Sequence, residues 1–141
     1  MKPEERFHDN PNGVISDIKT QLQWLPKDSW QDLGKWVDWE GARAYVKVMN
    51  QYYAGGYSDW RLPNKEEVLS LYDESLNHVD WAGETIHIHP VFVRKAAYCL
   101  WVNDVDEKDF ALWLNLRDGV IEYVEKTTKE HHAARLVRKH K

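Results

Sequence analysis

The sequence contains very little cysteine and no long apolar segment. Cys99 is the only cysteine in 141 residues, which rules out an intramolecular disulfide. Its neighbours Tyr98, Leu100 and Trp101 predict a buried thiol rather than a reactive one. The apolar runs are too short to cross a bilayer, and the first residues lack the apolar core of a signal peptide. We therefore expect a cytoplasmic protein without a membrane span.

An excess of positive charge is absent as well. The formal net charge is −4, with 30% charged and 43% hydrophobic residues. This balance is ordinary for a globular domain and gives no reason to expect nucleic acid or an anionic membrane as the main partner. A chain of 141 residues suffices for one domain with a sizeable core. We expect a single domain over residues 1–141 with short flexible ends.

Tryptophan, by contrast, is abundant. The chain has eight tryptophans, and four of them crowd into residues 24–39, namely Trp24, Trp30, Trp36 and Trp39. Most are expected to fill the core of a small, loop-rich domain, because an indole ring buries a large apolar area. The alternative is that one or two tryptophans line a ligand cleft.

The most informative segment runs from Gly55 to Tyr72 and predicts a strand-to-helix corner. Its glycine pair permits a turn, and its proline prevents helix at the preceding residue. Asn64 is a strong N-cap, and Glu67 stands where its side chain can complete a capping box. We interpret the corner as a structural motif with a buried tryptophan and an arginine that binds carboxylate or backbone oxygens: Asp59, Trp60, Arg61, Pro63 and Asn64.

Between the strands, the spacing of apolar residues predicts one further helix, and two long stretches predict loops. Asp38 is expected to cap a helix whose apolar positions recur at helical spacing from Trp39 to Tyr53. Residues 26–37 are typical of a polar, tryptophan-bearing loop, and residues 74–95 form a long mixed segment. A loop as long as the second is usually functional or mobile in a compact domain.

Alternating apolar residues and turn signals predict the strands. Strands are expected at residues 22–25, 96–102 and 136–137, and two hairpins are expected around Asn12-Gly13 and Asp118-Gly119. A two-residue turn at the second position pairs Leu116 with Ile121, Leu114 with Tyr123 and Leu112 with Glu125. This register buries Leu112, Leu114, Leu116, Ile121 and Tyr123. The opposite face carries Trp113 beside a polar row that includes Asn115 and Arg117.

Several of these motifs together resemble one known family. Residues 57–64, Tyr-Ser-Asp-Trp-Arg-Leu-Pro-Asn, are similar to the signature of the Lcl C-terminal domain family, a bacterial domain named after a collagen-like adhesin. Residues 6–24, 88–92, 110–124 and 134–138 also resemble that family, in the expected order. The resemblance implies an α+β, C-type-lectin-like fold, distantly similar to formylglycine-generating enzymes, with two helices and a twisted antiparallel sheet.

The resemblance also bears on function. The family's activity is mostly unassigned, and its best-understood members bind glycans on surfaces. The family's closing motif usually carries a cysteine, and this chain has Leu136 at that position. The second cysteine of the family's disulfide usually lies in the first helix, where this chain has Tyr45-Val46. The family's disulfide is therefore missing. Formylglycine-generating enzymes work through a cysteine pair, which a single cysteine does not supply. We therefore expect a non-catalytic ligand-recognition domain.

The expected ligand site lies on the sheet-and-loop face. Glycan binding needs an aromatic surface for the apolar side of a sugar and planar polar groups for its hydroxyls. These groups meet if the 103–109 loop folds over the second hairpin, and the candidate ligand-binding residues are Trp101, Asn103, Asp104, Asp106, Trp113, Asn115 and Arg117. The expected partner is a polar small molecule, a glycan or a protein.

Metal binding is the main alternative. Residues 101–107 are similar to the Trp-Asn-Asp motif of sugar-binding C-type lectins, with Val102 inserted after the tryptophan. Together with Asp109, their polar side chains offer oxygen ligands for calcium. A polar turn needs the same residues, and we favour that interpretation. His87 and His89 alternate along an extended segment and so point the same way, although a metal site needs three or four converging ligands.

Two other function classes stay open at this point. One is a metal-dependent enzyme that uses His87, His89 and the acidic loop, with calcium or a transition metal as its cofactor. The other is a protein-interaction module in a cytoplasmic complex, including a homo-oligomer. Against these alternatives, the expectation is a domain without a resident cofactor.

Overall fold

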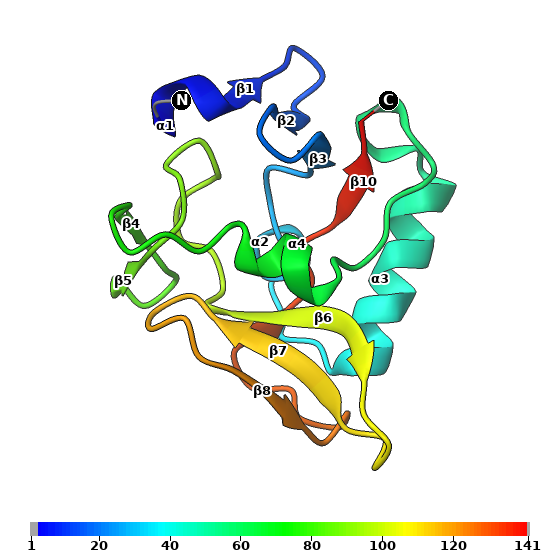
Figure 1. Ribbon diagram of the computed structural model, residues 1–141. Helices are drawn as coiled ribbons and strands as arrows, with labels where there is room; N and C mark the ends of the chain where they lie inside the picture. Colours follow the sequence, from blue (N-terminus) through cyan, green and yellow to red (C-terminus); the bar gives the residue numbers. More distant parts are fainter. Residues whose placement is uncertain (1–2, 141) are drawn as a thin grey trace.

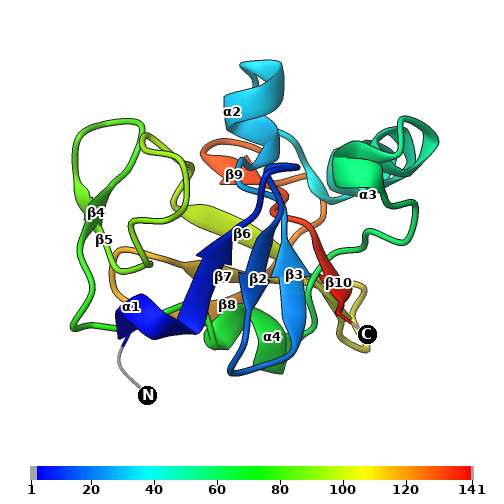
Figure 2. The same ribbon diagram turned by 90° about the horizontal axis from the view of Figure 1, so that it is seen from above.

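The computed structural model describes residues 3–140. They form an α+β domain whose first sheet has the strand order β1–β2–β3–β10 and is antiparallel throughout (Figure 1). Its strands are β1 (Phe7–Asp9), β2 (Ile15–Asp17), β3 (Leu22–Trp24) and β10 (Val137–Lys139). Because β10 pairs with β3, strands from the two ends of the chain share one sheet, with β1 and β10 at its opposite edges (Figure 2).

The second sheet, called the central sheet below because apolar clusters cover both faces of β6 and β7, has the order β8–β7–β6–β9. Its strands are β6 (Cys99–Val105), β7 (Ala111–Asn115), β8 (Ile121–Val124) and β9 (His132–Ala133). Strand β6 is antiparallel to β7 and parallel to β9. The long segment 74–95 contains a hairpin of its own, β4 (His78–Val79) with β5 (Thr85–Ile86), at the left of Figure 1.

The helices are mostly short. Helix α3 (Trp39–Gln51) begins after its N-cap Asp38, as predicted, and α4 (Lys65–Leu69) follows the strand-to-helix corner. The chain also has α1 (Pro3–Arg6), the 3-10 turn η1 (Ala54–Gly56) and α2 (Ser29–Leu33). Residues 26–37 were expected to be a loop, so α2 is a correction. A helix of five residues is too short to show an apolar period, and it begins because Asp28 and Gln31 form a capping box.

The corner at residues 59–64 has the predicted structure. Asn64 and Glu67 form the capping box at the start of α4, and only 2% of Trp60 is exposed. Both terminal nitrogens of Arg61 donate to the carboxylate of Glu67, at 2.6 and 2.8 Å. Asp59 accepts a hydrogen bond of 2.6 Å from Arg138 of β10. Arg61 forms an isolated β-bridge with Val137 of the same strand. The corner therefore ties α4 to the last strand of the first sheet.

Strands β6 and β7 are covered on both faces. One face belongs to an apolar cluster that includes Leu100, Val102, Leu112 and Leu114. The other face belongs to a second cluster, in which α3 and the corner tryptophan pack against Trp101, Ala111, Trp113 and Leu136. A strand pair buried on both faces leaves little sheet surface for a ligand, and this decides where a binding site can lie.

The register of the second hairpin differs from the prediction by two residues. Leu114 pairs with Ile121 and Leu112 with Tyr123, while the backbone N–H of Leu116 leaves the hairpin and donates to Tyr98. An even shift keeps each side chain on its predicted face. The prediction that Tyr123 is buried is nevertheless wrong: 40% of this residue is exposed, because it lies on the edge strand β8.

The corner should be a large contributor to stability. Trp60→Ala is expected to lower the free energy of unfolding by about 3–5 kcal/mol, since it empties a filled core position. Asn64→Ala should cost about 1 kcal/mol through loss of the cap. Urea denaturation followed by circular dichroism measures both changes. Tyr52→Ala, at a residue that is 80% exposed, is the control. A loss for Trp60→Ala no larger than that of the control would contradict the structural role of the corner.

Candidate functional site

The residues predicted for a ligand site do not come together in the structure. Trp101 is completely buried, and its indole N–H donates to the carbonyl of Val37 at 2.9 Å. A ligand has no access to this ring, so Trp101 is removed from the site. Helix α3 and the segment before it cover the face of β6 to which Trp101 belongs.

The polar candidates lie at opposite ends of the central sheet. The ladder pairs Cys99 with Asn115 at one end and Val105 with Ala111 at the other. Asn115 and Arg117 therefore lie at the first end, whereas Asn103, Asp104 and Asp106 lie toward the second. These residues do not meet, because Asn103, Asp104 and Asp106 lie beside the turn from β6 to β7, whereas Asn115 and Arg117 lie at the far end of β7.

The acidic loop has the structure of a polar turn. One carboxylate oxygen of Asp106 accepts from the backbone N–H groups of Lys108 and Phe110, both at 2.9 Å. Asp109 pairs with Lys126 at 2.7 Å. These contacts account for the aspartates by turn geometry. Within residues 3–140, no group of three or more His, Cys, Asp or Glu side chains is placed to hold a metal ion.

The two candidate metal ligands are each engaged with their own neighbours. His87 Nδ1 lies 2.8 Å from the carbonyl oxygen of Leu76, and its ring meets Tyr72 edge to face. His89 Nδ1 accepts from the N–H of Val91 at 3.0 Å. Both hydrogen bonds lie within the 74–95 segment, and the contact with Tyr72 joins this segment to the residues after α4.

Trp113 belongs to the packing of the second apolar cluster. It is half-buried, lies across the ladder from Trp101, and contacts the ring of His132 at 4.9 Å. His132 is buried between these two indoles, and this burial lowers the pKa of its imidazole. The indole nitrogen of Trp113 is enclosed without a hydrogen-bond partner. These are the properties of a packed ring rather than of a binding surface.

A different set of aromatic residues forms a partly exposed surface, which we call the aromatic cluster: Trp30, Trp36, Trp81, Tyr98 and His131. The rings of Trp30 and Trp36 are stacked with centroids 4.0 Å apart, and Trp81 meets both edge to face. His131 stacks on Trp81 at 5.3 Å, and its Nδ1 lies 3.1 Å from the hydroxyl of Tyr98. Trp81 is 38% exposed, and the other four are half-buried.

Polar groups border the aromatic cluster on one side. The guanidinium of Arg117 lies over the ring of Tyr98 at 3.7 Å, and its Nε donates to Asp80 at 2.8 Å. The other oxygen of Asp80 accepts from two backbone N–H groups of the β4–β5 turn, those of Ala82 and Glu84. The guanidinium is therefore held between the ring of Tyr98 and the carboxylate of Asp80. Of the residues predicted for the ligand site, Arg117 is the one that the structure brings to this surface.

One buried carboxylate holds three parts of the aromatic cluster in place. Asp28 caps α2 by accepting from the N–H of Gln31, and its second oxygen accepts from the N–H of Ala97 at 2.8 Å. The same oxygen lies 3.6 Å from Arg135, whose side chain is also completely buried. Burial raises the pKa of Asp28, although Arg135 and the backbone N–H groups favour its charged form. Through these contacts Asp28 joins three segments: α2 with Trp30, the residues before β6 with Tyr98, and the segment around β9 with His131.

Backbone conformation adds a further constraint at this surface. His131 has a φ of 68°, in the left-handed region that is uncommon for residues other than glycine. Such strain persists only where surrounding contacts fix the residue, and it is concentrated at functional sites. The contacts that fix it here are the stacking on Trp81 and the bond to Tyr98.

Sequence reasoning missed the aromatic cluster, although two signals pointed toward it. The crowding of tryptophans at residues 24–39 supplied Trp30 and Trp36, and the unusual length of segment 74–95 supplied Trp81. What was missing was the long-range contact between these segments. Figure 2 shows how the fold supplies it, with α2 lying beside β9 and the β4–β5 hairpin on the same side of the domain.

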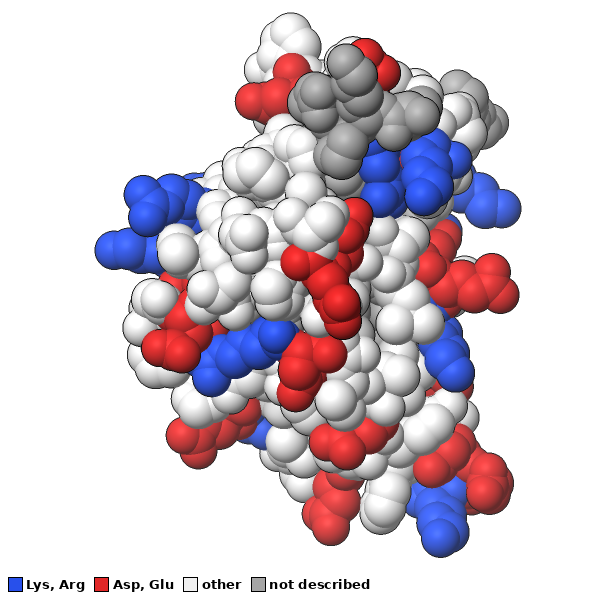
Figure 3. Space-filling model, turned by 60° about the vertical axis from the view of Figure 1, so that its left-hand side comes forward, with Lys and Arg blue, Asp and Glu red and all other residues white. Residues whose placement is uncertain are grey.

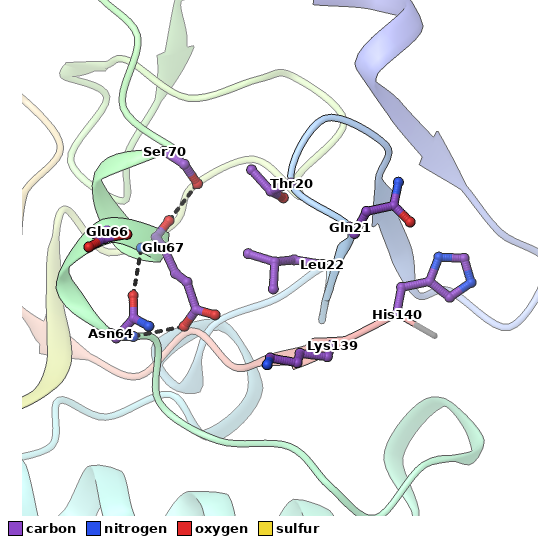
Figure 4. A pocket seen from close by; sticks show the side chains of 9 residues that line it. All are labelled: Thr20, Gln21, Leu22, Asn64, Glu66, Glu67, Ser70, Lys139 and His140. Atoms are coloured by element: carbon purple, nitrogen blue, oxygen red, sulfur yellow. Dashed lines mark hydrogen bonds between the residues drawn. The ribbon is translucent and has the colours of Figure 1, made fainter.

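The other hollows of the surface offer less defined chemistry. A hollow of about 540 Å³ lies between β3, α4 and the last described residues, and Figure 4 shows the side chains that line it. Its central carboxylate, Glu67, is already bound by Arg61 and by the N–H of Asn64, so it serves the corner motif. Figure 3 shows acidic and basic side chains interspersed on the side that carries β4 and β5, without a patch of one sign.

The comparisons with known proteins identify the family. The family model of the Lcl C-terminal domain matches residues 13–138. The chain belongs to the Lcl C-terminal domain family. No curated protein and no solved structure gave a significant match. The residues of the corner and of the aromatic cluster all lie within the matched range, whereas part of the opening motif, Arg6 to Asn10, lies before it. Among the described residues, no helix is long and apolar enough to span a membrane.

The buried pair of Asp28 and Arg135 should be essential for the structure around the aromatic cluster. Asp28→Ala is expected to lower the free energy of unfolding by about 3–5 kcal/mol, because it leaves an unpaired cation in the core. Urea denaturation measures the loss, and near-ultraviolet circular dichroism reports the tryptophan packing. The double variant Asp28→Ala/Arg135→Met should be more stable than the single one. If the two are equally stable, the pair is not the origin of the effect.

Cys99 should resist modification in the folded protein. It is 3% exposed, and burial raises the pKa of its thiol to about 12, so the reactive thiolate is scarce at neutral pH. Reaction with a thiol reagent such as DTNB should be slow in buffer and rapid in concentrated urea. Rapid labelling of the native protein would contradict this and would make Cys99 a candidate nucleophile.

Proposed function

We propose that the domain is a non-catalytic recognition module that binds a glycan, or another polar ligand with an apolar face, on the aromatic cluster. The observation that carries the proposal is the exposure of Trp81 together with the partly exposed guanidinium of Arg117, which the buried carboxylate of Asp80 holds in place. Aromatic rings accept the apolar face of a sugar, and a guanidinium is suited to its hydroxyls. The chain belongs to a family whose best-understood members bind glycans, which supports the same class of ligand.

The distribution of perturbed ionisable groups supports binding rather than catalysis. Catalytic groups with shifted pKa values usually lie in a cleft, where a substrate can reach them. Here Asp28, Cys99, His132 and Arg135 are buried in packing contacts. At the aromatic cluster, the raised pKa values of Tyr98 and Arg117 leave the phenol neutral and the guanidinium charged at neutral pH. A metal-dependent enzyme built on His87 and His89 has no comparable support, since each of these imidazoles is engaged by its neighbours.

The finer fold assignment belongs to the same proposal. We propose a C-type-lectin-like arrangement, in which strands from the two ends of the chain share one sheet and long segments fold across the domain. The pairing of β3 with β10 and the independent β4–β5 hairpin within residues 74–95 support this arrangement. In that fold, the long segments carry the binding residues, as segment 74–95 carries Trp81 here.

A protein-interaction module is the second candidate. Three of the exposed large hydrophobic residues, Leu33, Trp81 and Val93, belong to the segments that form or border the aromatic cluster. Exposed apolar groups gathered in one region are typical of protein contacts. Trp81 would then anchor a partner side chain instead of a sugar.

Glycan binding can be tested directly with substitutions at this surface. The purified domain is applied to a glycan array, and the strongest oligosaccharide is titrated by calorimetry. Trp81→Ala should weaken binding about tenfold or more, which corresponds to the loss of one aromatic contact of roughly 1.4 kcal/mol. Arg117→Lys keeps the charge but loses the planar fork, and it should weaken binding as well.

Tyr53→Ala is the matched control, since Tyr53 is an aromatic residue, 63% exposed, at the far end of α3. It should bind as the parent does, and all variants should melt near the parent temperature. Binding that survives Trp81→Ala, or an array without any signal, would overturn the proposed function.

A further inference from the structure

A shallow hollow next to α2 differs in charge from the rest of the molecule. It has a volume of about 400 Å³ and is lined by Lys27, Trp30, Gln31, Val93, Arg94 and Lys95. The chain as a whole has a net charge of −4, yet the lining has three cations and no acidic residue. Lys27, Arg94 and Lys95 are exposed, and within residues 3–140 none of them takes part in an ion pair.

The hollow also offers an apolar contact surface. Val93 is 39% exposed and Trp30 is half-buried, with one indole face stacked on Trp36. Cations around an apolar surface favour a ligand that carries both carboxylates and an apolar side chain. A free small anion would gain little from the apolar part.

The wall of the hollow is held by hydrogen bonds. The side-chain amide of Gln31 donates to the carbonyls of Val93 and Arg94, at 3.0 and 2.8 Å. The N–H of Val93 donates to Pro26, and that of Lys95 donates to Val79. The segment that presents the cations is therefore anchored on both sides. An anchored surface loses little conformational entropy on binding, which favours affinity.

We propose that this hollow docks an acidic segment of a protein partner, whose carboxylates pair with Lys27, Arg94 and Lys95 and whose apolar side chain covers Val93 and Trp30. The three cations come from two chain segments, so they flank the apolar surface instead of forming a single point charge. This arrangement matches an extended peptide better than a compact ligand. The proposal does not rest on the glycan site, since Trp81 and Arg117 take no part in it.

The probe is a fluorescently labelled, glutamate-rich peptide that carries one phenylalanine, and binding is followed by fluorescence anisotropy. The full chain should bind it, more weakly as salt is added. Lys27→Glu/Lys95→Glu should weaken binding tenfold or more. Lys47→Glu/Lys65→Glu makes the same change in net charge at exposed residues elsewhere and should bind as the parent does. A lysine-rich peptide should bind the first double variant better than it binds the parent.

The apolar part of the proposal has its own test. Val93→Ser should weaken the peptide with phenylalanine several-fold and leave unchanged a peptide in which serine replaces the phenylalanine. Equal loss in the two double variants would mean non-specific charge attraction and would overturn the proposal. So would the absence of binding. A sulfated oligosaccharide that binds more tightly than the peptide, and is indifferent to Val93→Ser, would show that the hollow takes anionic glycans instead.

Discussion

The buried ion pair of Asp28 and Arg135 is the interaction on which the structure around the candidate site depends. Asp28 joins the start of α2, the residues before β6 and the segment that follows β9. Arg135 extends this connection by donating to the carbonyl of Pro26 and by lying over the ring of Phe92. Two nitrogens of Arg135 have no hydrogen-bond partner, so the desolvation of the pair is only partly offset. An ionic connection of this kind specifies which segments meet more than it adds to stability.

The packing of the central sheet explains why the candidate site lies beside it. Both faces of β6 and β7 are covered by apolar clusters, and Trp101 and Trp113 are used in that packing. The aromatic residues that stay partly exposed come instead from α2, from the β4–β5 turn and from the loop before β9. The sheet and the ion pair act as the rigid support, and the connecting segments supply the binding residues, as is common for recognition sites.

Two neighbouring surfaces of different chemistry share this support. The aromatic cluster, with Arg117 and Asp80, is suited to a neutral polar ligand, whereas the hollow beside it gathers Lys27, Arg94 and Lys95. Trp30 belongs to both, since one face stacks on Trp36 and the residue also lines the hollow.

The sequence by itself determined the features that depend on neighbouring residues. The caps at Asp38 and Asn64 were predicted correctly because their bonds span three residues, and the faces of the hairpin were mostly correct because strand side chains alternate with a period of two. The two-residue register error had little effect on those faces for the same reason. The location of the site was decided by tertiary structure alone. Trp30, Trp81 and His131 are far apart in the chain and follow no local period, so only the packing of the whole domain brings their rings together.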